Sequence, residues 1–504
     1  MTTETPAAVG FRSDRGPVLA AVMLSTGLVA LDATIIATAV PSIVGDLGGF
    51  SQFPWLFSIY LLTQAVTTPL YGKVADSIGR KPVLFFGIGL FLVGSVLCGV
   101  AWNMTALILA RAVQGVGAGA VQPINVTIVG DLYSVAERAR VQGYLASVWG
   151  MSAVVGPALG GLFSEYLTWR WIFFINLPLG AVAVWMLATR FRERVERRPH
   201  RVDVAGAVTL TGGFSLLILG LLEGGVAWPW VSVPSLAIFV VGVGLLVAFV
   251  AVERRAAEPV LPLWVVSRRI LVGGNLTGLI VGALMIGLTS FLPTYAQGVL
   301  GAGPVVAGFA LAALTIGWPL AAGLSGRVYL RIGFRDTALI GSIFVITGSV
   351  LTALLTDDSQ IWAAAAAAFV VGFGFGLAAS PTVVAIQSVV GWDRRGVVTA
   401  ANLFSRSLGS AVGAAVFGAI ANATLAHRFA RPPADVAGQL PADADASNLI
   451  ATASDPQRSA AAEYVRQAIA DATHHVFVGL AVLAVLLVGA LLLMPRRSEQ
   501  LTFD

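Results

Sequence analysis

The sequence has 504 residues, of which 57% are hydrophobic and 11% charged, and its formal net charge at pH 7 is +5. Soluble domains carry about 25% charged residues, so this composition excludes an ordinary globular protein. Apolar stretches of about 20 residues, the length of a helix that crosses a bilayer, recur along nearly the whole chain. The sequence therefore predicts an all-α integral membrane protein with no room for a large soluble domain.

Fourteen membrane-spanning helices are predicted. Gly and Ala recur inside them, which favours helices packed closely on one another because small side chains let the backbones approach. The first apolar run is too long for a signal-peptide core and lacks a convincing small-residue cleavage site, so we expect it to be retained as a helix. In chain order the predicted spans cover residues 17–40, 53–72, 83–102, 105–129, 139–164, 171–190, 203–223, 232–252, 270–292, 304–325, 337–355, 361–385, 396–425 and 473–494.

The basic residues predict the orientation of these spans, because Lys and Arg accumulate in cytoplasmic loops. With the amino terminus inside, 24 of the 31 basic residues fall in inside segments or at the inner ends of the spans. Only two of them are Lys, a usage typical of GC-rich bacterial genomes. We therefore expect a multi-pass protein of the bacterial cytoplasmic (inner) membrane with both termini in the cytoplasm. The charge of +5 then reports orientation rather than nucleic-acid binding.

Two charged segments divide the spans into halves. The run "FRERVERRPHRV" at 191–202 and the segment 253–269 flank two spans that we interpret as a pair inserted between two six-span halves. The hydrophilic segment 426–471 predicts an extracytoplasmic loop with one short amphipathic helix, serving either as a flexible tether or as a lid or partner site. The predicted regions are a cytoplasmic tail at 1–16, a first six-helix half at 17–190, linkers with two inserted helices at 191–269, a second six-helix half at 270–494 and a cytoplasmic tail at 495–504.

Several kinds of chemistry are not expected from this chain. Cys98 is the only cysteine, which excludes an intramolecular disulfide and a multi-cysteine metal site. His474 and His475 are adjacent but have no third ligand in register, so a solvated junction is favoured over a metal site. No nucleotide-binding GxxxxGK(S/T) loop and no convergent cluster of His, Ser and acid occur, which argues against an ATP-driven pump and a membrane enzyme. We therefore expect no metal and no cofactor.

Residues 72–83 read "GKVADSIGRKPV", a charged stretch between two long apolar runs. Gly72 and Gly79 allow a tight turn between antiparallel spans, and Asp76 and Arg80 would place both signs of charge at the cytoplasmic rim. A loop that only obeys the positive-inside rule needs the basic residues, but it does not need an Asp framed by two glycines.

This stretch resembles the signature loop between the second and third spans of the major facilitator superfamily. The resemblance implies that Asp76 faces the amino terminus of the span beginning near Val397, whose dipole favours an anion. It also implies that Arg80 pairs with Asp131 at the end of the fourth span. These contacts would form a latch that holds the cytoplasmic side shut and breaks when that side opens.

Three further stretches resemble the fourteen-span drug:proton antiporter branch of that superfamily, the multidrug efflux type. In the first span, "LDATIIATAVPSI" resembles the branch's opening motif with an intramembrane aspartate, here Asp32. In the fourth, "LILARAVQGVGAGAV" resembles a motif built around Arg111. "GPALGG" at 156–161, followed by "WRWIFFINLPLG" at 169–180, resembles the antiporter motif. The resemblance covers most of the chain and implies the major facilitator fold, two six-helix halves plus two extra central helices.

Asp32 and Arg111 are the predicted proton-coupling residues. Asp32 lies about fifteen residues into the first span, roughly 22 Å of helix from its start. An ionisable group at that depth costs about 2.5–3.5 kcal/mol and is a functional candidate. We hypothesise that Asp32 takes a proton from outside and releases it inside, balanced by a facing Arg111. The alternatives are an idle carboxylate at the outer mouth and an arginine that only snorkels to the headgroups. Glu223 is a secondary proton-site candidate, and Asp203 is interpreted as a helix cap.

The "GPALGG" stretch combines a kink with small residues. Pro157 removes an intrahelical hydrogen bond, and Gly156, Gly160 and Gly161 let a neighbouring helix approach the bend. A plain packing seam would use the same residues, whereas the resemblance implies a tight, non-leaking closure.

The second half holds a weaker echo of the latch loop. "GRVYLRIGFRD" at 326–336 stands where an internal repeat would place a second copy, but Tyr329 and Leu330 replace Ala75 and Asp76. We interpret this second copy as structural, as expected for related halves that gate differently.

The substrate cavity is expected to be mostly apolar with sparse polar groups. Ordinary packing or an interhelical hydrogen bond would explain each candidate residue as well as substrate contact does. The candidate cavity residues are Tyr60, Gln64, Asn125, Trp149, Phe291, Gln297, Gln387 and Asn402.

Together these features predict a secondary active transporter, a drug:H+ antiporter that exports lipophilic compounds, cations among them, by alternating access. The alternative is an exporter of a lipid or hydrophobic metabolite with the same fold. A remote alternative is a membrane sensor or scaffold that transports nothing. The expected partners are a small hydrophobic substrate, protons and membrane lipids, with the chain acting as a monomer and binding no nucleic acid.

Overall fold

The computed structural model describes residues 10–11, 13–48, 52, 55–193, 203–224, 228–256, 259, 261–430, 432–433, 436, 460–497 and 501. Most of the charged run predicted at 191–202 therefore lies outside the described residues. The described chain is almost entirely helical, and its β structure is limited to an isolated bridge between Gly224 and Trp228.

The helices follow the chain in three groups. The first group is α1 (Gly16–Leu47), α2 (Trp55–Ile78), α3 (Arg80–Gly99), α4 (Met104–Leu132), α5 (Val135–Tyr166), α6 (Trp171–Phe174) and α7 (Asn176–Arg190). The second is α8 (Val204–Glu223) and α9 (Val233–Glu253). The third is α10 (Arg269–Gly298), α11 (Pro304–Ile332), α12 (Phe334–Ala353), α13 (Ile361–Ser388), α14 (Arg395–Phe429) and α16 (Ala460–Leu492). The short 3-10 helices η2 (Leu263–Val266) and η3 (Trp392–Arg394) precede α10 and α14.

Each predicted span coincides with a helix, with α6 and α7 together covering the span at 171–190. Within the described chain, thirteen helices are long and apolar enough to cross a membrane, counting α6 and α7 as one. The remaining helix, α2, is 24 residues long but more polar because it carries Gln64, Lys73 and Asp76. It packs against α4 and α14, inside the bundle. The predicted all-helical membrane fold is confirmed.

The structure corrects the extent of the loop predicted at 426–471. α14 continues to Phe429 and α16 begins at Ala460, so the expected separate amphipathic helix forms the first turns of α16 instead. The first sixteen residues of α16 contain no Gly or Pro, and their Ala-rich composition favours an uninterrupted helix. Tyr464 donates a hydrogen bond to the carbonyl oxygen of Arg428 at 2.6 Å and so ties the ends of the two helices together.

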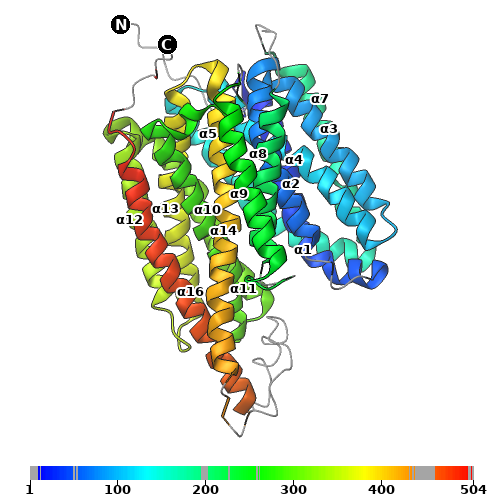
Figure 1. Ribbon diagram of the computed structural model, residues 1–504, viewed down its shortest axis with the longest axis vertical. Coiled ribbons are helices and arrows are strands. Elements are labelled where there is room, and N and C mark those ends of the chain that lie inside the picture. Colours follow the sequence, from blue (N-terminus) through cyan, green and yellow to red (C-terminus); the bar gives the residue numbers. More distant parts are fainter. Residues whose placement is uncertain are drawn as a thin grey trace.

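The two halves repeat one packing pattern. In the first half α1 packs against α5 and α7, while α2 and α3 pack against α4. In the second half α10 packs against α14 and α16, while α11 and α12 pack against α13. The halves meet where α5 contacts α11 and α2 contacts α14. The hairpin of α8 and α9 covers the second of these junctions through contacts of α8 with α2 and α14 (Figure 1).

Each half has its own apolar core. Buried side chains such as Ile88, Phe91 and Ile124 form one cluster within the first half. Val281, Phe375 and others form a larger cluster within the second half, built from α10 to α16. The two large apolar cores thus lie within the halves, while smaller clusters join them, such as Ala139 with Tyr329 and Val66 with Ala411.

Two glycines show that the halves are structurally related. Gly79, between α2 and α3, has φ +102°, and Gly333, between α11 and α12, has φ +91°. L side chains rarely adopt such values, so both sharp turns favour glycine strongly. Gly333 occupies the same place in "GRVYLRIGFRD" that Gly79 occupies in "GKVADSIGRKPV".

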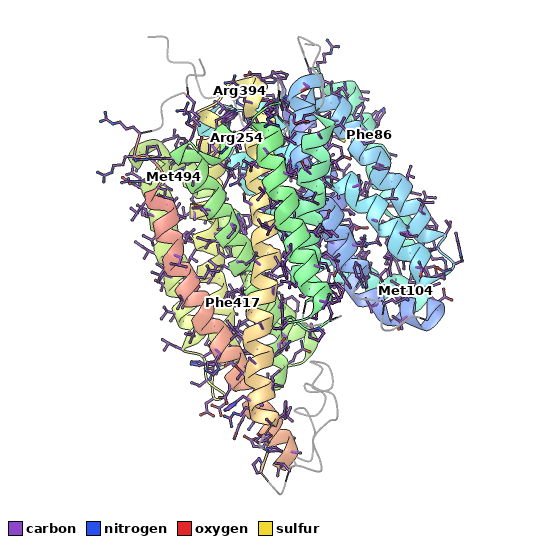
Figure 2. The ribbon with its side chains drawn as sticks, in the orientation of Figure 1. Phe86, Met104, Arg254, Arg394, Phe417 and Met494 are labelled. Carbon is purple, nitrogen blue, oxygen red and sulfur yellow. The ribbon has the colours of Figure 1, made fainter. Side chains whose placement is uncertain are left out.

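The end of the bundle that carries Asp76 is called the Asp76 end below. Figure 2 shows Arg254 and Arg394 at this end, whereas Met104, the first residue of α4, lies toward the opposite end. Charged side chains therefore mark the Asp76 end of the molecule.

The described helical bundle begins and ends at the Asp76 end. Arg15, just before α1, pairs with Glu137 at the start of α5 (Nη2 to Oε1, 2.6 Å), and this hydrogen bond raises the pKa of Arg15. Arg496, beyond α16, pairs with Asp336 at the start of α12 (Nε to Oδ2, 3.2 Å). Such partly exposed pairs add little stability, but they fix both ends of the bundle on one side.

Candidate functional site

Asp32 on α1 and Arg111 on α4 form an ion pair inside the first half. Arg111 Nη1 lies 2.6 Å from Asp32 Oδ2, and each side chain is only 1% exposed. Removing two charges from water is costly and is tolerated only where partners and hydrogen bonds satisfy both groups. The two predicted proton-coupling residues are therefore brought together, in a place shielded from solvent.

Three polar side chains complete this pair into a cluster that we call the Asp32 cluster. Gln114 Nε2 and Asn176 Nδ2 donate hydrogen bonds to Asp32 Oδ1 at 2.8 and 3.1 Å. Both amides also donate to Ser95 Oγ, at 2.8 and 3.2 Å. Arg111 Nη1 donates to Gln114 Oε1 at 2.6 Å. Side chains from α1, α3, α4 and α7 thus converge on one carboxylate.

Sequence reasoning missed Ser95, Gln114 and Asn176. Gln114 follows Arg111 by three residues, which puts both side chains on one helix face. The motif in the fourth span could therefore have predicted that Gln114 belongs to the Asp32 cluster. Asn176 stands in the quoted "WRWIFFINLPLG" stretch. Ser95 lies in an apolar span and gives no signal of its own.

Tyr60, a predicted cavity residue, lies against the Asp32 cluster instead. The Arg111 guanidinium carbon is 4.1 Å from the centre of the Tyr60 ring, a cation–π contact. Arg111 Nε also donates to the carbonyl oxygen of Leu56 at 3.2 Å. The Tyr60 hydroxyl is buried and has no hydrogen-bond partner among the described residues. The ring, rather than the hydroxyl, therefore holds Arg111 in place.

Asp76 connects the two halves at one end of the bundle. Its Oδ1 accepts the backbone N–H of Gly396 at 2.9 Å, and its Oδ2 accepts that of Val397 at 2.8 Å. These N–H groups begin α14, where free donors and the helix dipole favour an anion. Gly72, one turn earlier in α2, permits this approach because a Cβ there would lie 2.7 Å from the Gly396 carbonyl oxygen.

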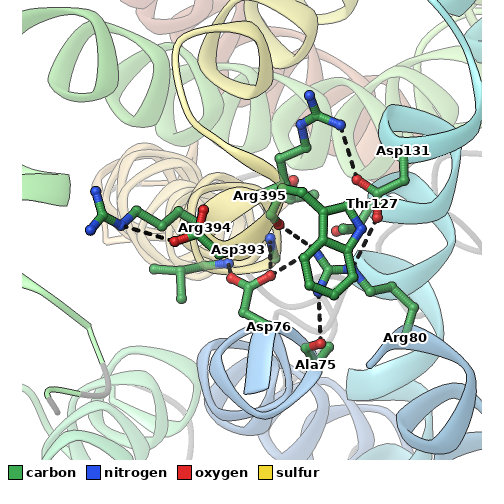
Figure 3. A network of polar contacts seen from close by, with 12 residues as sticks. Ala75, Asp76, Arg80, Thr127, Asp131, Asp393, Arg394 and Arg395 are labelled. Atoms are coloured by element: carbon green, nitrogen blue, oxygen red, sulfur yellow. Dashed lines mark hydrogen bonds and ion pairs between the residues drawn. The ribbon is translucent and has the colours of Figure 1, made fainter. Parts of the chain in front are cut away.

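Arg80 sits at the centre of the same contacts and is fully buried (Figure 3). Its Nε donates to Asp131 Oδ2 at 3.0 Å, and its Nη2 lies 2.9 Å from Asp76 Oδ1. Nη1 donates to the carbonyl oxygen of Ala75 at 2.7 Å, and Nη2 to that of Trp392 at 2.6 Å. The guanidinium also stacks 3.9 Å from the centre of the Trp392 ring. Arg80 thus joins α2 and α4 to the segment that precedes α14.

Asp131, at the end of α4, receives a second arginine from the other half. Arg395 Nη1 lies 3.1 Å from Asp131 Oδ1 and also donates to the Gly130 carbonyl oxygen at 3.0 Å. We call Asp76, Arg80, Asp131, Trp392 and Arg395 the latch network. It links the halves through charges that come from both of them.

Gln387, predicted to line the cavity, lies beside the latch network. Its Nε2 donates to the carbonyl oxygen of Val126 at 3.2 Å and to Thr399 Oγ1 at 2.9 Å. A Cβ on Gly130 would lie 2.6 Å from Gln387 Oε1, so the fit between α4 and α13 is tight. Because Gln387 is fully buried near the end of α13, the structure places it in the closure between halves and not on a cavity wall.

The second copy of the latch loop also joins the halves, but without charge. The Tyr329 hydroxyl donates to the carbonyl oxygen of Val135, the first residue of α5. One turn earlier, a Cβ on Gly326 would lie 2.5 Å from the Ala139 Cβ. Leu330, at the position equivalent to Asp76, is exposed. The junction of α2 with α14 therefore depends on the Asp76 carboxylate, whereas the junction of α5 with α11 depends on the Tyr329 hydroxyl.

The "GPALGG" stretch packs α5 against α1. A Cβ on Gly156 would collide with Thr34 Oγ1, and Thr34 donates a hydrogen bond to the Ser152 carbonyl oxygen at 2.8 Å. Gly160 is buried and Pro157 lies inside the helix, whereas Gly161 has no atom within 4 Å of where its Cβ would be. Thr34 follows Asp32 by two residues, so this seam and the Asp32 cluster share one segment of α1.

The remaining predicted cavity residues fall into two groups. Asn125 is hydrogen-bonded to Ser25 and Thr26 at 3.1 Å each, and Asn402 donates to the Gly274 carbonyl oxygen at 2.7 Å. Both asparagines are buried and hold neighbouring helices together. The other group keeps some accessible surface and comprises Gln64, Trp149, Phe291 and Gln297.

Two further acidic residues were singled out on α8. Asp203 caps that helix by accepting the Gly206 N–H at 2.8 Å, as the sequence predicts. Glu223 is the last residue of α8 and is buried, but α8 packs on α2, α9 and α14 and not on α1. The structure therefore leaves Glu223 outside the Asp32 cluster.

Close contact between α5 and α11 is concentrated toward the Asp76 end. A Cβ on Gly143 would lie 3.2 Å from Gly323, and one on Gly150 would lie 3.1 Å from the Thr315 carbonyl oxygen. Gly161 on α5 and Gly308 on α11, further along both helices, have open space where a Cβ would be. The close approaches of α5 to α11 at these glycines therefore lie toward the Asp76 end.

Known proteins share this architecture. Residues 22–414 match the family described as the Major Facilitator Superfamily. The chain is 35% identical over 407 residues to the multidrug transporter protein MdtP of Bacillus subtilis, which covers 80% of this chain and 75% of that protein. It is 34% identical over 407 residues to multidrug resistance protein 3 of Bacillus subtilis, covering 80% and 79%. It is 32% identical over 473 residues to the efflux pump dotC of Dothistroma septosporum, covering 90% and 80%.

A solved structure supports the fold independently of close sequence similarity. The crystal structure of the human organic anion transporter MFSD10 superposes with a TM-score of 0.64 at 14% identity. The match covers 97% of this chain and 100% of that chain. At this level of identity the likeness concerns the fold alone.

Proposed function

The chain belongs to the major facilitator superfamily, in its multidrug-efflux branch, and from this premise we propose that it exports lipophilic compounds in exchange for protons. It is a membrane transporter and not an enzyme. We further propose that the Asp76 end faces the bacterial cytoplasm, because basic residues gather in the loops at that end. Both termini would then be cytoplasmic.

The Asp32–Arg111 pair is the observation that carries proton coupling. A carboxylate held by one guanidinium and two amides inside a bilayer has two distinct states. When charged, it binds Arg111. When a proton neutralises it, the ion pair is lost and Arg111 keeps only the Gln114, Leu56 and Tyr60 contacts. Protonation therefore changes the forces between α1 and α4, and substrate export can be coupled to that change.

The latch network supplies the second requirement, a cytoplasmic closure that opens and closes. Its hydrogen bonds cross from the first half to the second, so they must break for the cytoplasmic side to open. In the structure they are formed, and the close glycine contacts between α5 and α11 lie toward the same end. We assign this arrangement to the outward-open state, in which Asp32 would take its proton and substrate would leave.

One proton supplies enough free energy for useful export. Moving one charge through about 100 mV yields about 2.3 kcal/mol. At about 1.36 kcal/mol per tenfold, this sustains roughly a 50-fold gradient of a neutral substrate. A single coupling carboxylate is therefore sufficient.

Transport of a lipid or hydrophobic metabolite is the alternative within the same fold. A sensor or scaffold that transports nothing would not need an intact latch or a buried charge pair, and this chain has both. Drug export and lipid export are distinguished by identifying the molecule that the protein transports.

The test is proton-driven uptake of lipophilic dyes into inside-out vesicles, comparing the unchanged protein with Asp32→Asn. The matched control is Asp46→Asn, which removes an exposed carboxylate from the same helix. We expect dye accumulation that collapses with the pH gradient, persists in the control and falls at least tenfold in Asp32→Asn. Full accumulation in Asp32→Asn would place the coupling site elsewhere, and absence of transport for every dye would favour lipid export.

A further inference from the structure

Arg406 lies near the middle of the membrane. It follows Arg395, the first residue of α14, by 11 residues and so stands about 16 Å along that helix. The hydrocarbon core of a bilayer is about 30 Å thick, so this depth is close to its midplane. Arg111 also lies well inside a predicted span, and it is fully paired.

Arg406, by contrast, has no polar partner within the described part of the chain. Among the described residues, its side chain makes no hydrogen bond and no ion pair, and the surrounding protein desolvates it. Ionisable residues in membrane spans almost always face the bundle interior or a water-filled cavity and have a partner there. An unpaired guanidinium at this depth therefore calls for a counter-ion, which the described residues do not supply.

The main chain of Arg406 is held firmly inside the bundle. A Cβ on Gly282 of α10 would collide with the Arg406 carbonyl oxygen, so the two backbones touch. Ser410 Oγ lies 3.1 Å from the Gly282 carbonyl oxygen and 3.2 Å from that of Arg406. α14 also contacts α2, α4, α8, α13 and α16. Even so, the Arg406 side chain is only half-buried. The Arg406 side chain therefore keeps accessible surface although its helix packs on several others.

Among the described residues, no carboxylate on the helices of the second half is placed to neutralise Arg406. α10, α11, α13 and α14 contain no Asp or Glu at all. Asp336 lies in the first turn of α12, at the Asp76 end. Glu463 and Asp471, near the start of α16, pair with Arg466 and Arg428. In the first half, Asp32 is already satisfied by three donors.

We propose that Arg406 recognises the substrate, and that the preferred substrates are lipophilic anions, with a carboxylate, phenolate or sulfonate on an apolar ring system. The anion would supply the missing counter-ion in a low-dielectric space, while a cation would be repelled. The planar guanidinium suits bidentate binding of such groups. This substrate class deepens the proposed function and replaces the lipophilic cations expected from the sequence.

Equilibrium binding to the purified protein tests this proposal independently of transport. Fluorescein, an anion, and a rhodamine ester, a cation, share one ring system, and their fluorescence anisotropy reports binding directly. The variants are Arg406→Gln, which removes the charge, and Arg406→Lys, which keeps it. Arg327→Gln is the matched control, because it removes an exposed arginine from the same half.

We expect the unchanged protein to bind the anion at least tenfold more tightly than the cation. Arg406→Gln should erase this preference, whereas Arg406→Lys and Arg327→Gln should retain most of it. If Arg406→Gln does not fold, the preference for the anionic dye can still be measured in the unchanged protein and in Arg406→Lys. Equal binding of the two dyes by the unchanged protein, or a preference that survives in Arg406→Gln, would overturn the proposal.

Vesicle transport then separates this proposal from the proposed function. If the protein binds the anion through Arg406 but moves no dye under a pH gradient, drug export fails and the binding site stands. If both dyes are exported equally and bound equally, export stands and the assignment of Arg406 fails.

Discussion

Asp76 Oδ2 accepts a hydrogen bond from the backbone N–H of Val397 at 2.8 Å, although the two residues are 321 positions apart in the sequence. The contact joins the end of α2 to the start of α14 and so bridges the two halves. An anion at a helix amino terminus is stabilised by the free N–H donors and by the helix dipole. The strength of this junction therefore depends on one negative charge.

Removing that charge should loosen the junction. Asp76→Asn keeps the shape of the side chain but loses the ion pair with Arg80 and weakens the cap on α14. Buried pairs broken on one side cost about 3–5 kcal/mol, so we expect a clear shift toward states open at the Asp76 end. Spin labels can be placed at the exposed positions Ile78 and Leu330, one in each half. Double electron–electron resonance should then report a longer distance between the two labels in Asp76→Asn than in the unchanged protein.

The control for this experiment is Asp336→Asn. Asp336 lies at the same end but pairs with Arg335 and Arg496, all within the second half. Its loss should leave the distance between the labels unchanged. An unchanged distance distribution in Asp76→Asn as well would show that the latch network does not control closure.

Tyr60 provides a test that separates packing from substrate binding. Its ring stacks on Arg111, while its hydroxyl has no partner among the described residues. Tyr60→Phe should therefore retain transport and change the free energy of unfolding by less than about 0.5 kcal/mol, whereas Tyr60→Leu should reduce both transport and stability. A loss of substrate affinity in Tyr60→Phe would restore Tyr60 as a cavity residue.

The "GPALGG" stretch contains its own matched pair of substitutions. Gly156→Val would drive a side chain into Thr34 and should destabilise the protein by about 1–3 kcal/mol, with loss of transport. Gly161→Ala places a methyl group in open space and should be neutral or slightly stabilising, because Ala favours the helix. Thermal unfolding in detergent, followed with the transport assay, measures both. Equal tolerance of the two variants would argue against a tight seam between α1 and α5.

Asp46 lies past the end of the first predicted span, and its contacts predict a stability that depends on pH. Hydrogen bonds from Arg170 and Trp169 hold the pKa of Asp46 below its usual value. A carboxylate with a lowered pKa adds stability above its unfolded-state pKa and loses that contribution as the pH falls through its native value. Asp46→Asn should therefore lower the unfolding temperature slightly near neutral pH, with the difference vanishing in acid. A difference that is the same at every pH would contradict a charge-dependent contact.

The sequence by itself predicted where the membrane-spanning helices lie and which charged residues stand inside them. A span is a local property, because about 20 consecutive apolar residues suffice to cross a bilayer. A buried charge is also visible locally, since Asp32 and Arg111 stand out against apolar neighbours. The glycines that frame Asp76 marked residues 72–83 as unusual, and the resemblance to the superfamily's signature loop implied a latch there.

Tertiary structure decided which side chains meet. The convergence of Ser95, Gln114 and Asn176 on Asp32 depends on how four helices are rotated against one another, which no single segment encodes. The same holds for Gln387, which the sequence placed in the cavity and which packs beside the latch network, and for the helix that extends α16 toward Arg428. The lack of a partner for Arg406 among the described residues is likewise a property of the assembled bundle, because it requires that none of the neighbouring helices supplies one.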